Sequence, residues 1–146
     1  MESIKKIKKG IPFINSVWDK EFITIEGNAY SLGHIEHEIL RKEFDEPRIH
    51  FAIVCASISC PKLLNAAYTT DQLEAQLTQQ TKEFINDSTR NKIEASQAQL
   101  SKIFSWFKGD FTKKGTLADY LNQYSNTQIP ADAKISYLDY DWGLNE

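Results

Sequence analysis

The spacing of hydrophobic positions along the chain predicts short strands and amphipathic helices. Residues 22–25 (FITI) form a strand pattern, turn residues follow at 26–28, and residues 29–32 return, which predicts a hairpin. Ser31 stands at an N-cap position, and apolar residues recur after it at helical spacing as far as Phe44. We therefore expect a helix that ends before Pro47.

The next apolar segment, residues 48–55 (RIHFAIVC), carries apolar side chains on both faces of an alternating pattern. This is typical of a central strand that is covered on two sides. A loop containing Pro61 follows, and a helix is expected through residues 73–85, opened by a capping box of Thr69 and Gln72 and ending near Asn86.

The C-terminal third predicts two short paired strands at 92–95 and 98–103, a helix at 116–124 and a closing strand at 135–142. Between them, Ser101 is a plausible cap for an aromatic helical turn whose side chains are typical of a core: Phe104, Trp106, Phe107 and Phe111. No repeat or low-complexity linker interrupts the chain. We predict one domain over residues 1–146 of the α/β (α+β) class, with helices packed on a single mixed or antiparallel sheet.

Composition and charge narrow the choice of partners. The net charge of −3 is spread over interspersed Lys, Arg, Asp and Glu, which argues against a nucleic acid partner. The basic run at residues 5–9 is typical of a solvated chain end. No apolar run approaches the roughly 20 residues of a membrane span, and Met1 is not followed by a signal peptide pattern. The expected partner is an unidentified protein or small molecule, and the compartment stays open.

Motifs that define common enzyme classes are absent. The chain has no nucleotide-binding glycine loop, no H-E-x-x-H and no G-x-S-x-G, and we expect no cofactor. A metal site built from His37, Cys55 and Cys60 is a weak alternative, because a lone C-x4-C lacks the second pair of a zinc site.

Residues 31–61 hold all three histidines and both cysteines, which marks this segment as the candidate site. On a helical wheel, Glu36 falls in the middle of the apolar arc, His37 at its edge and His34 on the polar side. A carboxylate aimed at the core needs a partner such as Arg48, or a cleft that raises its pKa. His37 is thus the better site candidate and His34 the solvated residue.

Cys55 ends the predicted central strand, where a thiol would be accessible to a ligand. With His37 as base it could act as a nucleophile, although a packed and inert cysteine is equally typical. Cys60 lies in the loop and is a second candidate nucleophile or a disulfide partner of Cys55. A regular strand would place His50 about 16 Å from Cys55 on the opposite face, which sets His50 aside.

Five separated segments resemble the domain-of-unknown-function family 547 (DUF547): SLGHIEHEILR, DEPRIHFAIVCASISCPKL, AYTTDQLEAQL, LSKIFSWFKGDF and the terminal YDWGLN. Together they extend over nearly the whole chain. The positions that match the family's motifs are Glu36, His37, Arg41, Arg48, Cys55, Pro61, Trp106, Asp110 and Phe111. Arg41, Arg48 and Asp110 thereby become candidate binding residues.

The resemblance also implies a missing segment. Family members usually carry a W-I-N-x-Y-N-A type segment ahead of this region, and bacterial members often bear an export signal. Neither is present here. The chain therefore resembles the C-terminal portion of a longer DUF547-type domain, and a site that needs the absent asparagines would be incomplete.

Three functions are consistent with this pattern. The first is a non-catalytic binding or assembly domain, in which Glu36, His37 and Arg48 form a polar core anchor and Cys55 is packed. The second is a cysteine-dependent hydrolase or acyl transferase, loosely papain-like or transglutaminase-like, with Cys55 or Cys60 as nucleophile, His37 as base and Glu36 in support. The third is a redox or metal site formed by Cys55 and Cys60. We rank the binding domain slightly first.

Overall fold

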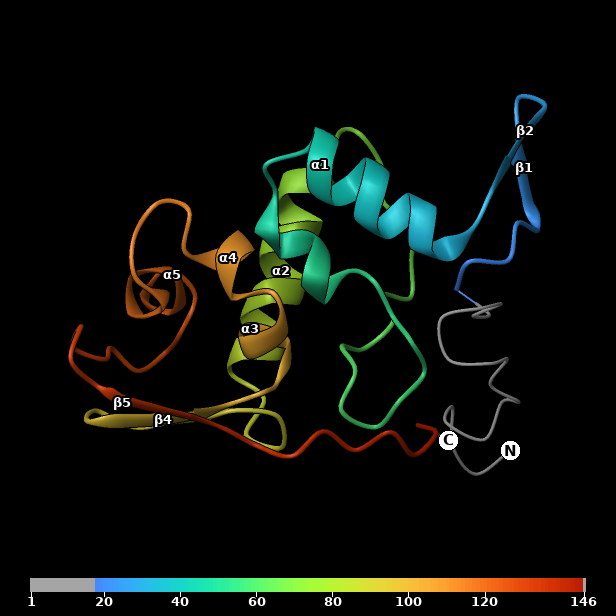
Figure 1. Cartoon of the computed structure of the whole chain (residues 1–146). Coiled ribbons are helices and arrows are strands. Elements are labelled where there is room, and N and C mark those ends of the chain that lie inside the picture. Colours follow the sequence, from blue (N-terminus) through green and yellow to red (C-terminus); the bar gives the residue numbers. More distant parts are fainter. Residues whose placement is uncertain (1–17, 146) are drawn as a thin grey trace.

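The computed structural model describes residues 18–145, so the basic run at residues 5–9 lies outside the described residues (Figure 1). The elements in chain order are β1 (Ile23–Ile25), β2 (Asn28–Tyr30), the π-helix η2 (His34–Leu40), α1 (Arg41–Glu43), the 3-10 helix η3 (Pro47–Phe51), α2 (Leu73–Ile85), β3 (Lys92–Ile93), β4 (Gln97–Leu100), α3 (Ile103–Trp106), α4 (Lys108–Phe111), α5 (Leu117–Asn122) and β5 (Lys134–Tyr137).

The strands form two small sheets. β1 and β2 make the expected antiparallel hairpin, with Ile23 opposite Tyr30. In the second sheet β4 lies in the middle, antiparallel to β3 and parallel to β5, with Ala98 beside Ile135. The mixed α+β class is therefore confirmed, although the strands of the described chain divide into two sheets instead of one.

Aromatic side chains build the core around α2, which lies in the middle of the molecule between α1 and the β4–β5 pair (Figure 1). Phe51 from η3 packs on Phe84 of α2, with ring centroids 5.0 Å apart. Phe104 and Phe111 complete the group, each in contact with Phe51. All four are nearly or fully buried, so burial of these rings holds η3, α2, α3 and α4 together.

Several predicted helix boundaries are confirmed. The Ser31 hydroxyl accepts a hydrogen bond from the His34 amide, as expected of an N-cap. Helix α2 ends at Ile85 with Asn86 as its C-cap, and α5 is preceded by a capping box formed by Thr116 and Asp119. The unexpected feature is that most of the first helix is a π-helix, in which the Arg41 amide bonds back to the Glu36 carbonyl.

The central strand predicted at residues 48–55 is wrong. The chain forms η3 instead, followed by an irregular loop. Pro47 occupies the first helical turn, and the Glu46 carboxylate accepts a hydrogen bond from the Arg48 amide. The consecutive residues His50 and Phe51 are both buried. In the sequence, two adjacent buried residues give the same pattern as a strand that is covered on both faces. This removes the strand geometry that set His50 aside.

Two smaller expectations also fail. Helix α2 has Gln72 as its N-cap without a side-chain bond, and the Thr69 amide donates to Gln76 instead of forming a capping box. Trp106 is 47% exposed and lies outside the core, where its ring packs at a tilt against Tyr140 and stacks on Trp142.

Candidate functional site

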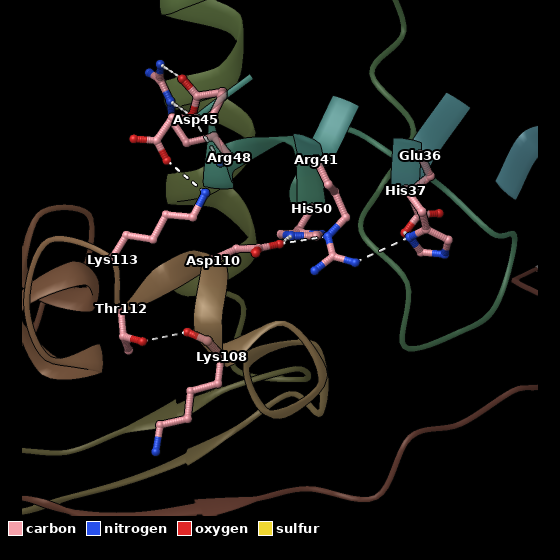
Figure 2. Close-up of polar contacts among 11 residues, drawn as sticks. Glu36, His37, Arg41, Asp45, Arg48, His50, Lys108, Asp110, Thr112 and Lys113 are labelled. Atoms are coloured by element: carbon pink, nitrogen blue, oxygen red, sulfur yellow. Dashed lines mark hydrogen bonds and ion pairs between the residues drawn. The ribbon is translucent and has the colours of Figure 1, made fainter. Parts of the chain in front are cut away.

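Side chains of the candidate segment, residues 31–61, belong to two separate groups, and each group also includes a residue from later in the chain. The first, which we name the Asp110 cluster, comprises Arg41, His50 and Asp110 (Figure 2). One carboxylate oxygen of Asp110 accepts hydrogen bonds from Arg41 Nε and His50 Nε2, both at 2.8 Å. The His50 ring stacks on Phe107 at 4.0 Å, and the Arg41 guanidinium lies over the same ring. Asp110 thus joins α1, η3 and α4 through one carboxyl group.

Burial and charge fix the protonation states of this cluster. Burial opposes ionisation of Asp110, but the hydrogen bonds from Arg41 and His50 outweigh it and hold the pKa of Asp110 below its ordinary value. Burial lowers the pKa of His50 despite the neighbouring carboxylate. The stable arrangement at neutral pH is an ionised Asp110 with a neutral His50 that donates its Nε2 proton.

His37 lies at the edge of the Asp110 cluster. Its Nδ1 is 3.4 Å from Arg41 Nη1 and 3.8 Å from Glu36 Oε1, and its side chain is half exposed. The helical wheel places Glu36 in the middle of the apolar arc, and its side chain is partly buried. His34 is exposed, as expected. Glu36 and His37 therefore stay together on η2, and Arg41 connects them to Asp110.

Arg48 lies in a different network from the one expected for it. It donates to both oxygens of Glu46, to Glu74 and to the Thr78 hydroxyl, so it ties η3 to α2. The binding hypothesis pairs Arg48 with Glu36 and His37, whereas the structure gives it these other partners.

The second group, which we name the thiol cluster, comprises Cys55, Ser57, Cys60 and Tyr140. The two Sγ atoms lie 3.1 Å apart, and both cysteines are free thiols. Cys55 Sγ is 3.2 Å from Ser57 Oγ and 3.5 Å from the Tyr140 hydroxyl. Cys60 is buried while Cys55 is partly accessible, so the two thiols differ in their access to a reactant.

The loop that carries the thiols is fixed on two sides. Arg90, which follows α2, donates to the carbonyls of Ile58 and Cys60. On the other side the C-terminal segment pairs with the loop through an isolated bridge between Ser57 and Leu144 and a hydrogen bond from the Ile58 amide to the Gly143 carbonyl. The loop is therefore held in one shape before any ligand arrives.

One residue of this loop has an unusual backbone. Ala56 has φ +60°, a left-handed conformation that non-glycine residues rarely adopt. The Asn145 amide donates to its carbonyl, which helps to hold this turn. Because Ala56 separates Cys55 from Ser57, the turn brings both side chains to the Tyr140 hydroxyl.

Electrostatics separates the two thiols further. Hydrogen bonds from Cys60, the Tyr140 phenol and the Ser57 amide lower the pKa of Cys55 against the effect of burial. The pKa of Cys60 is raised by its hydrogen bond to Cys55 and by burial. Burial also raises the pKa of Tyr140, which keeps its phenol protonated as a donor. The pair thus releases its first proton readily and its second with difficulty.

The hydroxyls form a short relay toward Cys55. Ser57 donates to the Tyr140 oxygen at 2.9 Å, which leaves the phenol proton of Tyr140 for the Cys55 sulfur. Sequence reasoning missed both residues. Ser57 could have been found from its place between the two cysteines, but Tyr140 is 83 residues away from Ser57 and carries no local signal.

The structure brings together some of the predicted site residues and separates others. Cys55 meets Cys60, and Asp110 meets Arg41. The hydrogen bonds of His37 and of the thiols lead to different partners within the described residues. Among residues 18–145 no three His, Cys, Asp or Glu side chains are grouped as metal ligands would be. In the same range no helix has the length and apolar character needed to cross a membrane.

Comparison with known protein families gives a match. The family described as "Protein of unknown function, DUF547" matches residues 4–85, more than half of the chain. This chain is a member of the DUF547 family. The DUF547 match contains η2, η3 and both cysteines, whereas Asp110 and Tyr140 lie beyond it. Neither the curated proteins nor the solved structures contain a match to this DUF547 chain.

Proposed function

We propose that this DUF547 domain carries out thiol–disulfide exchange, with Cys55 as the attacking thiol and Cys60 as the resolving thiol. The observation that carries the proposal is the 3.1 Å separation of the two Sγ atoms in a loop fixed on both sides. A nucleophile that only transfers acyl groups needs a base beside it and has no use for a second thiol. A dithiol that exchanges with disulfides needs that second thiol in this place.

The reaction begins with the Cys55 thiolate. It attacks one sulfur of a disulfide in the substrate, and a mixed disulfide forms as the other substrate sulfur leaves as a thiolate. Cys60 then gives its proton to that thiolate and attacks Cys55 Sγ. The products are a Cys55–Cys60 disulfide and a substrate with two reduced sulfurs, so two electrons move from the protein to the substrate.

The difference between the two cysteines supports these roles. Cys55 is partly accessible and has a lowered pKa, which are the properties of an attacking thiol. Cys60 is buried and has a raised pKa, so it reacts only when a mixed disulfide brings an electrophilic sulfur next to it. The Tyr140 phenol stabilises the Cys55 thiolate before it attacks the substrate.

Oxidation by glutathione disulfide tests the proposal. The reduced protein is incubated with glutathione disulfide, quenched with acid and analysed by intact mass. We expect the wild type to lose two protons without gaining glutathione, Cys60→Ser to accumulate a glutathione adduct on Cys55, and Cys55→Ser to react far more slowly. Ser96→Ala, at the exposed turn between β3 and β4, is a matched control.

Two results would contradict thiol–disulfide exchange. One is a wild type that accumulates the glutathione adduct and does not form the internal disulfide. The other is an equal rate of adduct formation at Cys55 in native and denatured protein, since a free chain lacks the hydrogen bonds of the thiol cluster.

A binding or assembly function is the second candidate, and a separate observation favours it. Neither η2 nor α1 contains a buried residue, and Leu32 and Phe44 at their ends are exposed. An apolar helix face with this exposure is typical of an interaction surface. Sedimentation of the wild type and of Leu32→Ser/Phe44→Ser tests self-assembly: a monomer at all concentrations counts against it, and a dimer abolished by the double variant supports it.

A further inference from the structure

Three aromatic side chains lie together beside the thiol cluster, and we name them the aromatic platform: Trp106, Tyr140 and Trp142. The centroid of the Tyr140 ring lies 4.8 Å from that of Trp106 and 4.5 Å from that of Trp142. The two indoles stack on each other with their centroids 5.7 Å apart. The three rings therefore form one continuous aromatic surface, which contains two of the three tryptophans of the chain.

The platform is open to solvent. Trp106 is about as exposed as it is buried, and Trp142 is only partly buried. Ile58, in the loop that carries the thiols, is exposed as well. Burial of rings of this size contributes strongly to folding, as it does for the phenylalanines of the core. Aromatic side chains that stay exposed in one group are typical of a surface that binds a partner.

Hydrogen bonds hold the platform in a fixed place relative to the thiols. The Ile58 and Ser59 amides donate to the carbonyls of Gly143 and Asp141, and the Asp141 amide donates to Ser59 Oγ. Figure 1 shows the C-terminal segment passing beside the loop that follows η3. A Cβ at Gly143 would lie only 3.0 Å from Ile58 Cδ1, so the contact is close. The rings are thus in position before a partner arrives.

Tyr140 belongs both to the platform and to the thiol cluster. Its hydroxyl lies 3.5 Å from Cys55 Sγ, and its ring packs against both indoles. An extended chain advances about 3.3 Å for each residue. A polypeptide whose sulfur reaches Cys55 therefore brings a side chain one or two residues away to the level of the indoles.

The charges around the platform do not select a charged partner. Lys102 is paired with Asp139, and Arg90 is paired with Asp87. Asp141 Oδ1 accepts a hydrogen bond from a backbone amide. Asp139 and Asp141 are both exposed, and exposed ion pairs contribute little free energy. The packing of rings is thus the main source of preference, and it favours an aromatic side chain on the partner.

We propose that the aromatic platform binds the polypeptide that carries the substrate disulfide, and that it favours an aromatic side chain within two residues of the reacting cysteine. The inference rests on the thiol–disulfide exchange proposed above. The aromatic side chain of the substrate packs on Trp106 and Trp142 while Cys55 attacks the neighbouring sulfur. Large apolar side chains are usually buried in folded proteins, so the substrates that fit are unfolded or extended segments.

Oxidation of the reduced full chain by two peptide disulfides tests the proposal. The probes are the symmetrical disulfides of acetyl-Cys-Gly-Phe-amide and acetyl-Cys-Gly-Ala-amide, which are uncharged and have the same residues next to the sulfur. Samples are quenched with acid, and formation of the internal disulfide is followed by intact mass. We expect the phenylalanine probe to oxidise the wild type about tenfold faster than the alanine probe, because its ring is buried on the platform.

Trp106→Ala should bring the ratio of the two rates close to one. The ratio is the informative quantity, because the alanine probe reports any change in the reactivity of Cys55 itself. Phe22→Ala removes another exposed aromatic ring, next to β1, and should keep the wild-type ratio. A thermal melt of each variant identifies a ratio that is lost through unfolding.

Each other outcome counts against a specific claim. Equal rates of the two probes with the wild type would overturn the preference and leave thiol–disulfide exchange standing. An unchanged ratio in Trp106→Ala would overturn the role of the platform. No oxidation by either probe or by glutathione disulfide would overturn both proposals. A wild-type dimer in sedimentation that Trp106→Ala abolishes would assign the platform to a second copy of the chain, against a peptide substrate.

Discussion

The two cysteines depend on their neighbours in opposite ways. Cys55 gains hydrogen bonds to its thiolate from the Tyr140 phenol and the Ser57 amide, whereas Cys60 is buried among groups that disfavour a second negative charge. A pair of identical residues five positions apart thereby acquires two distinct roles. The Tyr140 phenol is the group whose removal separates these effects most cleanly, since Phe keeps the ring in place.

Tyr140→Phe should therefore raise the pKa of Cys55 and slow its alkylation. In the wild type, the rate with iodoacetamide should reach its plateau at a pH below the ordinary thiol range, because the Cys55 pKa is lowered. In the variant we expect the plateau at higher pH and a rate several-fold lower near neutral pH. Tyr30→Phe, on the hairpin, is the control that should keep the wild-type profile. Identical profiles for Tyr140→Phe and the wild type would contradict a hydrogen bond to the thiolate.

His50 should make the protein less stable in mild acid. Its pKa is lowered in the folded protein from the ordinary 6.5, so the unfolded chain binds a proton more readily than the folded one. The stabilisation is complete above about pH 6.5 and is lost as the pH falls below that value. Urea unfolding at a series of pH values between 8 and 5 measures it as a falling free energy of unfolding.

His50→Phe should flatten this pH dependence, while His34→Gln, at an exposed position, should keep it. Asp110 and Arg41 face His50 directly, and His37 lies beyond Arg41. The lowered pKa of Asp110 adds a second loss only below about pH 3.8, so the two groups act in separate ranges. An unchanged pH dependence in His50→Phe would assign the effect to another group.

At the scale of elements, the helices differ in how much they bury. Helix α2 and η3 carry most of the first half of the core, whereas η2 and α1 contain no buried residue. The stability of the fold should thus depend on η3 far more than on the longer helix before it.

Phe51→Ala and Phe44→Ala test this difference with the same chemical change. Phe51 is fully buried, and its truncation should cost about 3 to 5 kcal/mol in the free energy of unfolding. Phe44 is 54% exposed, and its truncation should cost less than about 1 kcal/mol. Urea unfolding measures both. Equal losses would mean that α1 is packed as tightly as η3.

The pattern of the sequence predicts those elements whose local signals agree. The hairpin at 22–30 has turn residues between two strands, and Ser31 caps a helix as its position indicates. Residues 48–55 fail because alternation cannot distinguish a strand covered on both faces from a short helix with two adjacent buried residues. The Glu46 carboxylate and Pro47 favour the start of the η3 helix, and both residues precede the alternating segment 48–55.

The candidate site was predictable to the same extent. Cys55 and Cys60 are named by their place in the sequence, and Asp110 by its family resemblance. Ser57 and Tyr140 join the thiols only through the C-terminal segment, which meets the loop in three dimensions. The role of His50 depended on the strand at 48–55, so the error in one element carried over to one residue.

At the scale of the whole molecule, the core does not follow the boundary of the family match. The match ends at residue 85, but Phe51 and Phe84 pack against Phe104 and Phe111. Asp110 also supplies the carboxylate for Arg41 and His50. The matched segment therefore contains only part of the core. It also contains only some members of each cluster, because Asp110 and Tyr140 lie beyond residue 85.

A fragment of residues 1–85 should consequently be unfolded by itself. We expect narrow amide proton dispersion in its NMR spectrum and no cooperative thermal transition, whereas the full chain shows both wide dispersion and a cooperative melt. Mixing the fragment with residues 86–146 is the control, since association that restores dispersion would show that the missing half of the core is the cause. A fragment that folds alone would contradict this account.

The distance between the thiols and Tyr140 along the chain has a consequence for biosynthesis. Tyr140 leaves the ribosome 83 residues after Ser57, which is a delay of roughly 4 to 17 s at the usual rates of translation. During that interval both cysteines belong to a growing chain that lacks the Tyr140 hydroxyl and its hydrogen bond to Cys55. Any oxidant or folding helper that meets the nascent protein before then would act on two ordinary thiols, and the reactive pair exists only once the segment that carries Tyr140 has been made.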